Sequence, residues 1–109
     1  KTPCPPFESA YRHGHMGGAA RADLESLYLR AGLQAIEAPA DYLGTILECA
    51  ALLTEQAGME PLRRELEDDH IRRWVPRFSR DLQENGGLIL YRTLGERIAQ
   101  RFPETQDRE

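Results

Sequence analysis

Apolar side chains recur every three or four residues along most of the chain, and this spacing constrains the fold more than any other feature. Because an α-helix has about 3.6 residues per turn, such a spacing places the apolar residues on one helix face. One stripe consists of Leu24, Leu27, Tyr28 and Ala31, and another of Leu43, Ile46, Leu47, Ala50, Leu53 and Ala57. No segment alternates with the two-residue period of a half-buried strand. The sequence therefore predicts an all-α fold, a helical bundle.

Glycine and proline residues mark where these helices are expected to begin and end. The first helix runs from Ala19, and Gly32 closes it because glycine accepts a positive φ angle. The second opens after Ala38, with Pro39 tolerated in its first turn, and it ends at Gly58.

The second half of the chain predicts three further helical segments. One starts near Pro61 and turns Leu62 and Leu66 inward. Proline removes a backbone donor, so we expect a break or kink between His70 and Pro76. A new helix then passes through Phe78 and Leu82 and stops at Asn85, Gly86 and Gly87. The last helix, from Leu88 to Arg101, carries a stripe of Tyr91, Leu94, Ile98 and Phe102.

The first 18 residues are rich in proline and glycine, so we expect an extended arm there rather than a long helix. A single helical turn from Pro6 to Tyr11 is the exception. The predicted organisation is thus an arm over residues 1–18, a helical domain over 19–103 and a polar tail over 104–109.

The size and charge of the chain exclude several classes of protein. Its 109 residues suffice for one small domain. A net charge of −4 argues against a nucleic-acid binder, and no apolar run approaches the ~20 residues of a membrane span. Cys4 and Cys49 are too few for a disulfide scaffold, which suits a reducing cytosol, and Cys49 is expected to pack as a small apolar group.

Catalytic signatures are missing, so we predict no enzyme and no cofactor. The sequence has neither a glycine-rich phosphate loop nor a nucleophile elbow. A metal site would have to gather Cys4, His13, His15 and His70. His13 and His15 lie two apart in a glycine-rich arm, where no helix places both on one face.

Two features in the second half of the chain can be interpreted either as purely structural or as functional. Trp74 and Phe78 are four residues apart, so they either anchor the core or line a groove. The acidic run from Glu65 to Asp69 is either a solvated face, a helix cap at Asp68 or Asp69, or a receptor for arginines.

Read together, several blocks resemble the TorD/DmsD/NarJ family of chaperones, and most closely its TorD/DmsD branch. Pro5 to Tyr11 resembles the family's Pro-Pro-aromatic-x-Ser-x-aromatic stretch, and Glu37 to Gly44 resembles its Glu-x-Pro-x-Asp-His motif. His70 to Phe78 resembles the His-x-x-x-Trp-x-x-x-Phe block, and Leu90 to Gly95 resembles the start of the last family helix.

Two departures from the family pattern stand out. Tyr42 replaces the motif histidine and gives up its titration near neutral pH. The chain also resembles only the C-terminal part of family members, so the helical fold is expected to be incomplete. The apolar stripes that further helices would bury are then exposed unless something else packs on them. A second copy of the chain could do so in a homodimer, with or without domain swapping.

The resemblance implies a cytoplasmic chaperone that binds the twin-arginine signal peptide of a molybdopterin oxidoreductase catalytic subunit until cofactor insertion is complete. Its peptide-binding residues would be Phe7, Tyr11, Pro39, Asp41, Tyr42 and Trp74. No nucleic acid, metal or stable membrane insertion is implied, and a guanine nucleotide site has no residues here to support it. Two alternatives remain open: a small metal-binding enzyme using His13, His15 and His70, and a dimeric helical adaptor that recognises no signal peptide.

Overall fold

Helices account for all the regular secondary structure among the residues that the structure, a computed structural model, describes: 4–85 and 89–103. This confirms the all-α prediction. The α-helices are α1 (Glu8–His13), α2 (Ala19–Arg30), α3 (Leu43–Glu55), α4 (Glu60–Leu66), α5 (Arg72–Asn85) and α6 (Ile89–Arg101). A π-helical turn, Glu67–Ile71, joins α4 to α5.

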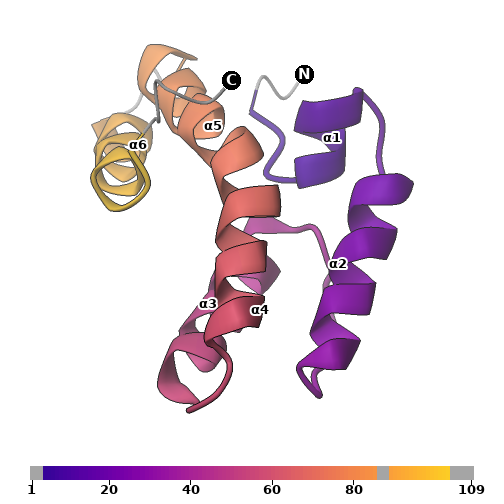
Figure 1. Cartoon of the computed structure of the whole chain (residues 1–109). Coiled ribbons are helices and arrows are strands. Elements are labelled where there is room, and N and C mark those ends of the chain that lie inside the picture. The colour runs from indigo at the N-terminus through magenta and orange to yellow at the C-terminus, as the bar shows by residue number, and fades with distance from the viewer. Residues whose placement is uncertain (1–3, 86–88, 104–109) are drawn as a thin grey trace.

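The helices surround a central rod (Figure 1). α4, the π-helical turn and α5 follow one another through the middle of the molecule, with α1 and α2 on one side. α1 contacts both α2 and α5, α3 contacts α4, and α6 packs along α5. Within the predicted arm, residues 8–13 therefore form a helix that packs against the helical body.

The predicted end of α2 at Gly32 is confirmed. Gly32 has a φ of +78°, the left-handed conformation that ends a helix at little cost for glycine. The N–H of Leu33 donates back to the carbonyl of Tyr28 at 2.8 Å, which satisfies one of the last carbonyls of the helix. This turn leads the chain into a loop, residues 33–38, that runs beside α3.

The predicted start of the second helix after Ala38 is wrong, because α3 begins only at Leu43. The backbone around Asp41 bonds to the segment before α1 instead. The N–H of Glu8 donates to the carbonyl of Asp41 at 3.0 Å, and the N–H of Leu43 donates to the carbonyl of Pro6 at 2.9 Å. The predicted end at Gly58 is also late, since α3 ends at Glu55 and Gln56 is already extended.

The predicted break between His70 and Pro76 is replaced by an irregularity one turn earlier. The π-helical turn occupies Glu67–Ile71, and α5 then passes through Pro76 as part of one helix. A π-helical turn inserts an extra residue into the helical ladder, which changes the direction of the side chains that follow it. It places His70 and Ile71 in the interior.

The acidic run around this turn pairs with arginines of the chain rather than capping a helix. Glu65 accepts from Arg30 of α2 at 2.6 Å and 3.0 Å, and Glu67 accepts from Arg63 at 3.2 Å. Asp68 and Asp69 are exposed. The solvated-face interpretation therefore describes Asp68 and Asp69, whereas Glu65 and Glu67 are half-buried.

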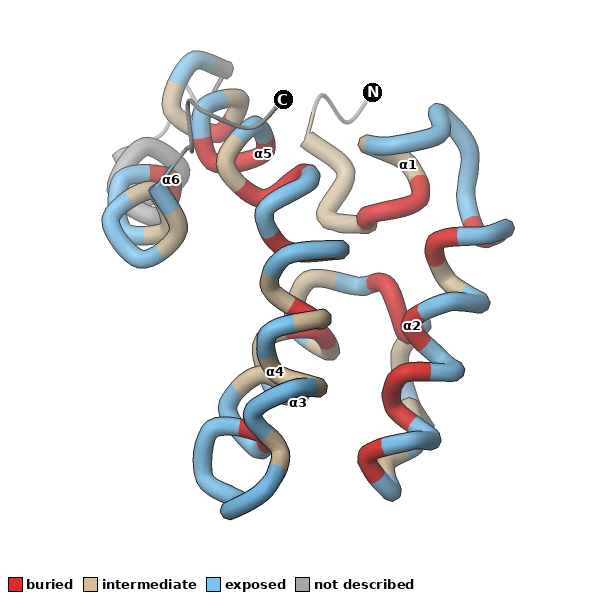
Figure 2. Tube along the Cα trace, in the orientation of Figure 1, coloured by how far each residue is buried: buried red, intermediate tan, exposed pale blue. Residues whose placement is uncertain are grey.

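The core is formed mainly by residues of α2, α3, α4, the π-helical turn and α5. Figure 2 shows buried positions of α2 on the side that faces the central rod. The buried members of the core are Leu24, Leu27, Tyr28, Ala31, Ala40, Ile46, Cys49, Leu53, Leu66, Ile71, Trp74, Val75, Phe78 and Leu82. This core contains residues of both predicted apolar stripes, the one from Leu24 to Ala31 and the one from Leu43 to Ala57, and it also contains Trp74. Cys49 is one of these residues, as expected of a small apolar side chain.

α6 joins the body through α5. The hydroxyl of Ser79 donates to the carbonyl of Gly95 at 2.7 Å, and a Cβ at Gly95 would meet the Ser79 carbonyl oxygen at 2.7 Å. Glycine is thus required for the close approach of the two helices. Ile98 and Phe102 pack against the core, as the last stripe predicts.

Several predictions fall on parts of the chain outside the described residues. These are Leu88 and the stop at Gly86 and Gly87, the side chains of Asn85, Tyr91 and Leu94, the Leu90 to Gly95 block apart from its helical backbone and Gly95, and the tail over 104–109. Within the described residues, no helix is long and apolar enough to cross a membrane.

Candidate functional site

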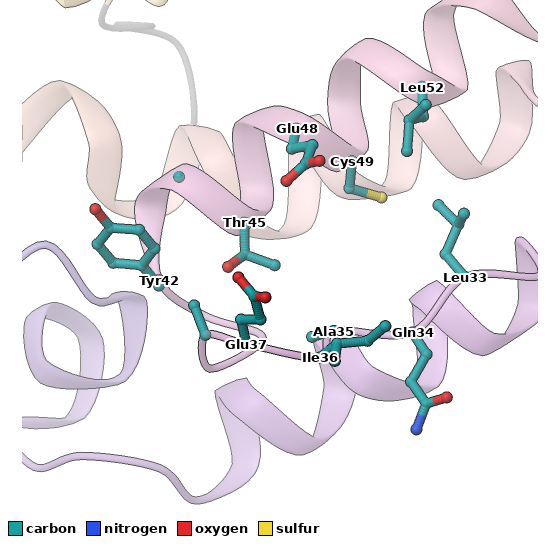
Figure 3. A pocket seen from close by; sticks show the side chains of 12 residues that line it. Leu33, Gln34, Ala35, Ile36, Glu37, Tyr42, Thr45, Glu48, Cys49 and Leu52 are labelled. Carbon is teal, nitrogen blue, oxygen red and sulfur yellow. The ribbon is translucent and has the colours of Figure 1, made fainter.

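A pocket of about 520 Å³ lies between the loop at residues 33–38 and one face of α3 (Figure 3). This volume falls within the range of small-molecule and peptide side-chain sites. The pocket is lined by Leu33, Gln34, Ala35, Ile36, Glu37, Ala38, Tyr42, Gly44, Thr45, Glu48, Cys49 and Leu52. The loop supplies one wall and the exposed face of α3 supplies the other.

Apolar side chains and carboxylates dominate the pocket. Ile36 is 87% exposed, and Leu52 and Tyr42 are also exposed although they are large and apolar. The charged lining residues are Glu37 and Glu48, both acidic. Glu37 extends from the loop toward the face of α3 that carries Glu48 (Figure 3). Such a surface can bury apolar groups and accept hydrogen bonds from cations.

The Tyr42 ring forms the end of the pocket next to the start of α3. It lies so close to Gly44 that a Cβ there would meet Tyr42 Cε2 at 2.6 Å. The Phe7 ring also contacts the Tyr42 ring, with the two centroids 5.5 Å apart. Phe7 and Tyr42 also form an isolated antiparallel β-bridge. The N-terminal segment therefore supports this end of the pocket directly.

Asp41, which precedes Tyr42, is fully buried and connects three segments. Its carboxylate accepts from the N–H of Ser9 at 2.9 Å, from the Ser9 hydroxyl, and from Arg21 Nε at 2.8 Å. Burial by itself raises the pKa of Asp41, but the bonds from Ser9 and the charge of Arg21 outweigh burial and lower that pKa. Asp41 thereby caps α1, since Ser9 lies in the first turn of that helix.

A second charged cluster centres on the buried ring of His70. Its Nδ1 lies 2.8 Å from Glu8 Oε2, and its Nε2 lies 2.7 Å from Asp23 Oδ2. Arg12 donates to the same Glu8 oxygen at 2.6 Å. Burial by itself lowers the pKa of His70, but Glu8 and Asp23 outweigh burial and raise that pKa above its ordinary value.

An aromatic cluster joins α1 to α5. The Tyr11 ring lies 5.6 Å from Trp74 and 5.8 Å from Phe78, and its hydroxyl donates to Asp81 at 2.7 Å. Trp74 is fully buried, in agreement with the core interpretation. Arg77 lies over the Tyr11 ring at 5.2 Å from the centroid. These contacts fix α1 on the central rod.

The comparison with known families decides the assignment. The sequence model of the nitrate reductase delta subunit family matches residues 1–80. The chain belongs to this family. Members of the nitrate reductase delta subunit family are chaperones for the maturation of molybdoenzymes rather than enzymes. No significant match was found among curated proteins or among solved structures.

The family assignment confirms the resemblance to the TorD/DmsD/NarJ chaperones at the level of the whole family. It also supports a molybdoenzyme subunit as the general kind of partner. Placement in the TorD/DmsD branch stays a prediction.

The structure of this delta-family chaperone places the six predicted peptide-binding residues in two groups. Phe7, Pro39, Asp41 and Tyr42 lie together at the start of α3, and among them Tyr42 lines the pocket. Tyr11 and Trp74 belong to the aromatic cluster between α1 and α5. The two groups are linked at α1, where the N–H of Tyr11 donates to the carbonyl of Phe7 at 3.2 Å.

Other pocket residues of the chaperone were missed by sequence reasoning. Glu37 was part of a motif block but was not singled out, and Ile36, Glu48 and Leu52 were not considered. Leu52 is exposed, although its neighbour Leu53 belongs to the buried stripe of α3. A large apolar residue just off a helical stripe is the signal that could have found it.

The histidines of the chaperone do not converge. His13 and His15 are exposed with ring centroids 6.1 Å apart, whereas both nitrogens of His70 face carboxylates. Over residues 4–85 and 89–103, no group of three histidine, cysteine, aspartate or glutamate side chains is arranged to hold a metal ion. The alternative metal site thus has no geometric support in the described chain.

Proposed function

We propose that this chaperone binds the twin-arginine signal peptide of a molybdopterin oxidoreductase catalytic subunit in the pocket between α3 and the loop at residues 33–38. Binding in the cytoplasm would hold the subunit back from export while its cofactor is inserted. The observation that carries the proposal is the composition of the pocket, which combines exposed apolar side chains with the carboxylates of Glu37 and Glu48.

Both parts of such a signal peptide suit this lining. An apolar stretch gains about 25 cal/mol for each Å² that it removes from water against Ile36, Tyr42 and Leu52. Guanidinium groups form charge-assisted hydrogen bonds with carboxylates, and these set the register of the peptide. The acidic balance of the whole chain, 18 acidic against 14 basic residues, favours the same kind of ligand.

The six residues implied by the resemblance take different roles in this proposal. Tyr42 contacts the peptide from the end of the pocket, and the exposed Pro39 borders the peptide's path ahead of α3. Phe7 supports the Tyr42 ring from behind. Asp41 is a positioning residue, because its buried carboxylate is already bound by Ser9 and Arg21.

Tyr11 and Trp74 are positioning residues too. Their ring contact attaches α1 to α5, and α1 in turn follows the segment that supports Tyr42. We place the chaperone in the TorD/DmsD branch as part of the same proposal, on the motif blocks at Pro5 to Tyr11, Glu37 to Gly44 and His70 to Phe78.

Calorimetry with a synthetic peptide tests this function. A peptide with an Arg-Arg pair followed by an apolar stretch should bind, and its affinity should fall as salt rises. The Glu37→Gln/Glu48→Gln double variant should weaken binding roughly tenfold, since each exposed ion pair contributes about 0.2–1 kcal/mol. Glu25→Gln/Glu55→Gln removes two exposed carboxylates outside the pocket and should leave the affinity unchanged.

Two results would contradict the proposal. One is the absence of any binding heat from the intact, folded chain. The other is equal weakening by the pocket variant and its matched control, because net charge rather than the pocket would then determine affinity.

A Lys-Lys peptide should bind less tightly than the Arg-Arg peptide, because lysine cannot make the paired hydrogen bonds of a guanidinium.

A further inference from the structure

His70 occupies the point where α1, α2 and the π-helical turn meet, and it holds all three together. Its ring is almost completely buried, and its two nitrogens face Glu8 and Asp23 at 2.8 Å and 2.7 Å. A neutral imidazole donates from only one nitrogen, whereas the imidazolium donates from both. The arrangement of one carboxylate at each nitrogen therefore fits the charged ring.

Several charged side chains surround this ring, and most of them have an ion-pair partner of opposite charge. Those that face it from other elements are Glu8 and Arg12 on α1, Asp23 on α2 and Glu65 on α4. Glu65 pairs with Arg30, and Arg12 also donates to the backbone carbonyl of Asp69 at 3.1 Å. In the π-helical turn itself, Glu67 pairs with Arg63, Asp68 pairs with Arg72, and Asp69 is exposed.

A short series of contacts leads from this cluster to the pocket. Glu8 is bound through its side chain by His70, and its backbone N–H donates to the carbonyl of Asp41 at 3.0 Å. Next to that bond, Phe7 supports the Tyr42 ring, and the carbonyl of Pro6 accepts from the N–H of Leu43. The position of α1 therefore determines where the pocket residue Tyr42 lies.

We propose that His70 is a positioning residue for the pocket, which it keeps formed by clamping Glu8 to Asp23, so that loss of its ring proton loosens the pocket. The link to peptide affinity rests on the proposed function, whereas the link to Tyr42 does not. The direction of the pH effect follows from the raised pKa of His70. The clamp is complete below the ordinary pKa of histidine, about 6.5, and is lost as pH rises through the higher folded value.

Nuclear magnetic resonance of the full chain tests the link to Tyr42 without any peptide. The His70 ring should titrate with a midpoint above about 6.5, and the amide signals of Glu8, Tyr42 and Leu43 should move with that same midpoint. The proposal is overturned if His70 titrates at or below 6.5, or if the amides of Tyr42 and Leu43 do not follow its ring.

Two variants separate the clamp from a general effect on folding. Asp23→Asn removes the exposed partner, whose side chain is 58% accessible, and should move the shared midpoint to lower pH while the chain stays folded. His70→Gln should abolish the titration at Tyr42 and Leu43. His13→Gln, an exposed histidine outside the cluster, should change neither. An unmoved midpoint in Asp23→Asn contradicts the proposal even if His70→Gln fails to fold.

The link to peptide binding is tested by repeating the calorimetry with the Arg-Arg peptide at one pH below and one pH above the midpoint of the His70 titration. Apparent affinity is proportional to the fraction of molecules whose pocket is formed, so binding should weaken about fivefold or more above the midpoint. Equal affinity at both pH values overturns the link to binding. Absence of binding at low pH overturns the proposed function instead, and the amide titration still decides the positioning role.

Discussion

Asp41 lies just ahead of α3, yet its carboxylate serves α1 and α2. It binds the N–H and hydroxyl of Ser9 and the guanidinium of Arg21, and none of these groups is near it in sequence. A buried carboxylate with several charge-assisted partners is stable only while all of them remain in place. Asp41 thus fixes the residue that follows it, Tyr42, at the end of the pocket.

Asp41→Asn should destabilise the fold by about 2 kcal/mol, because it removes the charge that Arg21 faces while keeping the side-chain shape. Urea unfolding measures this change. The lowered pKa of Asp41 adds a pH signature: its contribution is complete above the ordinary pKa of aspartate, about 3.9, and is lost as pH falls through the folded value.

Asp68→Asn is the matched control for this change. Asp68 is exposed and pairs with Arg72 one helical turn away at 3.2 Å, so its loss should cost less than about 0.5 kcal/mol. Equal destabilisation by the two variants would show that Asp41 has no special place in the structure.

The candidate site could be predicted only in part, because sequence motifs show which residues recur but not what they contact. Of the motif residues Asp41 and Tyr42, only Tyr42 lines the pocket, and its role in binding stays a prediction. The burial of Asp41 by Ser9 and Arg21 depends on contacts across 32 and 20 residues, which no local pattern reveals. The same holds for His70, which was considered as a metal ligand and is instead bound by two carboxylates.

At the level of the helices, two glycines have different structural roles. Gly32 has a positive φ and ends α2, whereas Gly44 lies inside α3 and leaves room for the Tyr42 ring. The first role was predictable, because a glycine after an amphipathic stripe is a local signal. The start of α3 was not, since backbone bonds to Pro6 and Glu8 hold residues 41–43 outside the helix.

Gly44→Ala should displace the Tyr42 ring and weaken peptide binding while the chain remains folded. The added Cβ would meet Tyr42 Cε2 at 2.6 Å, and the ring is partly exposed and able to move. Alanine also favours a helix interior by about 1 kcal/mol over glycine, which offsets the cost of moving the ring. Tyrosine fluorescence quenching and calorimetry measure the two effects.

Gly32→Ala provides the contrast. It forces a side chain into a backbone conformation with φ of +78° and should cost about 1 kcal/mol in unfolding without changing the affinity of the folded protein. If Gly44→Ala left peptide affinity unchanged, the placement of Tyr42 would have no role in binding.

In the whole molecule, the buried charges and the pocket form one connected arrangement. α1 is attached to the central rod through His70 and the Trp74 cluster, and to the start of α3 through Asp41. The pocket lies beyond that junction, between α3 and the loop that follows α2. The family assignment gives the general chaperone role. The proposed function places a client peptide in this pocket, next to the residues that hold α1 in position.

The most direct test of peptide binding in the pocket is a map of amide signal changes across the full chain as an Arg-Arg signal peptide is added. We expect the largest changes in the loop at residues 33–38 and at Tyr42, Thr45, Glu48 and Leu52, with smaller changes for the Lys-Lys peptide. Saturable changes that fall elsewhere, or no changes at millimolar peptide, would contradict the pocket as the signal-binding site.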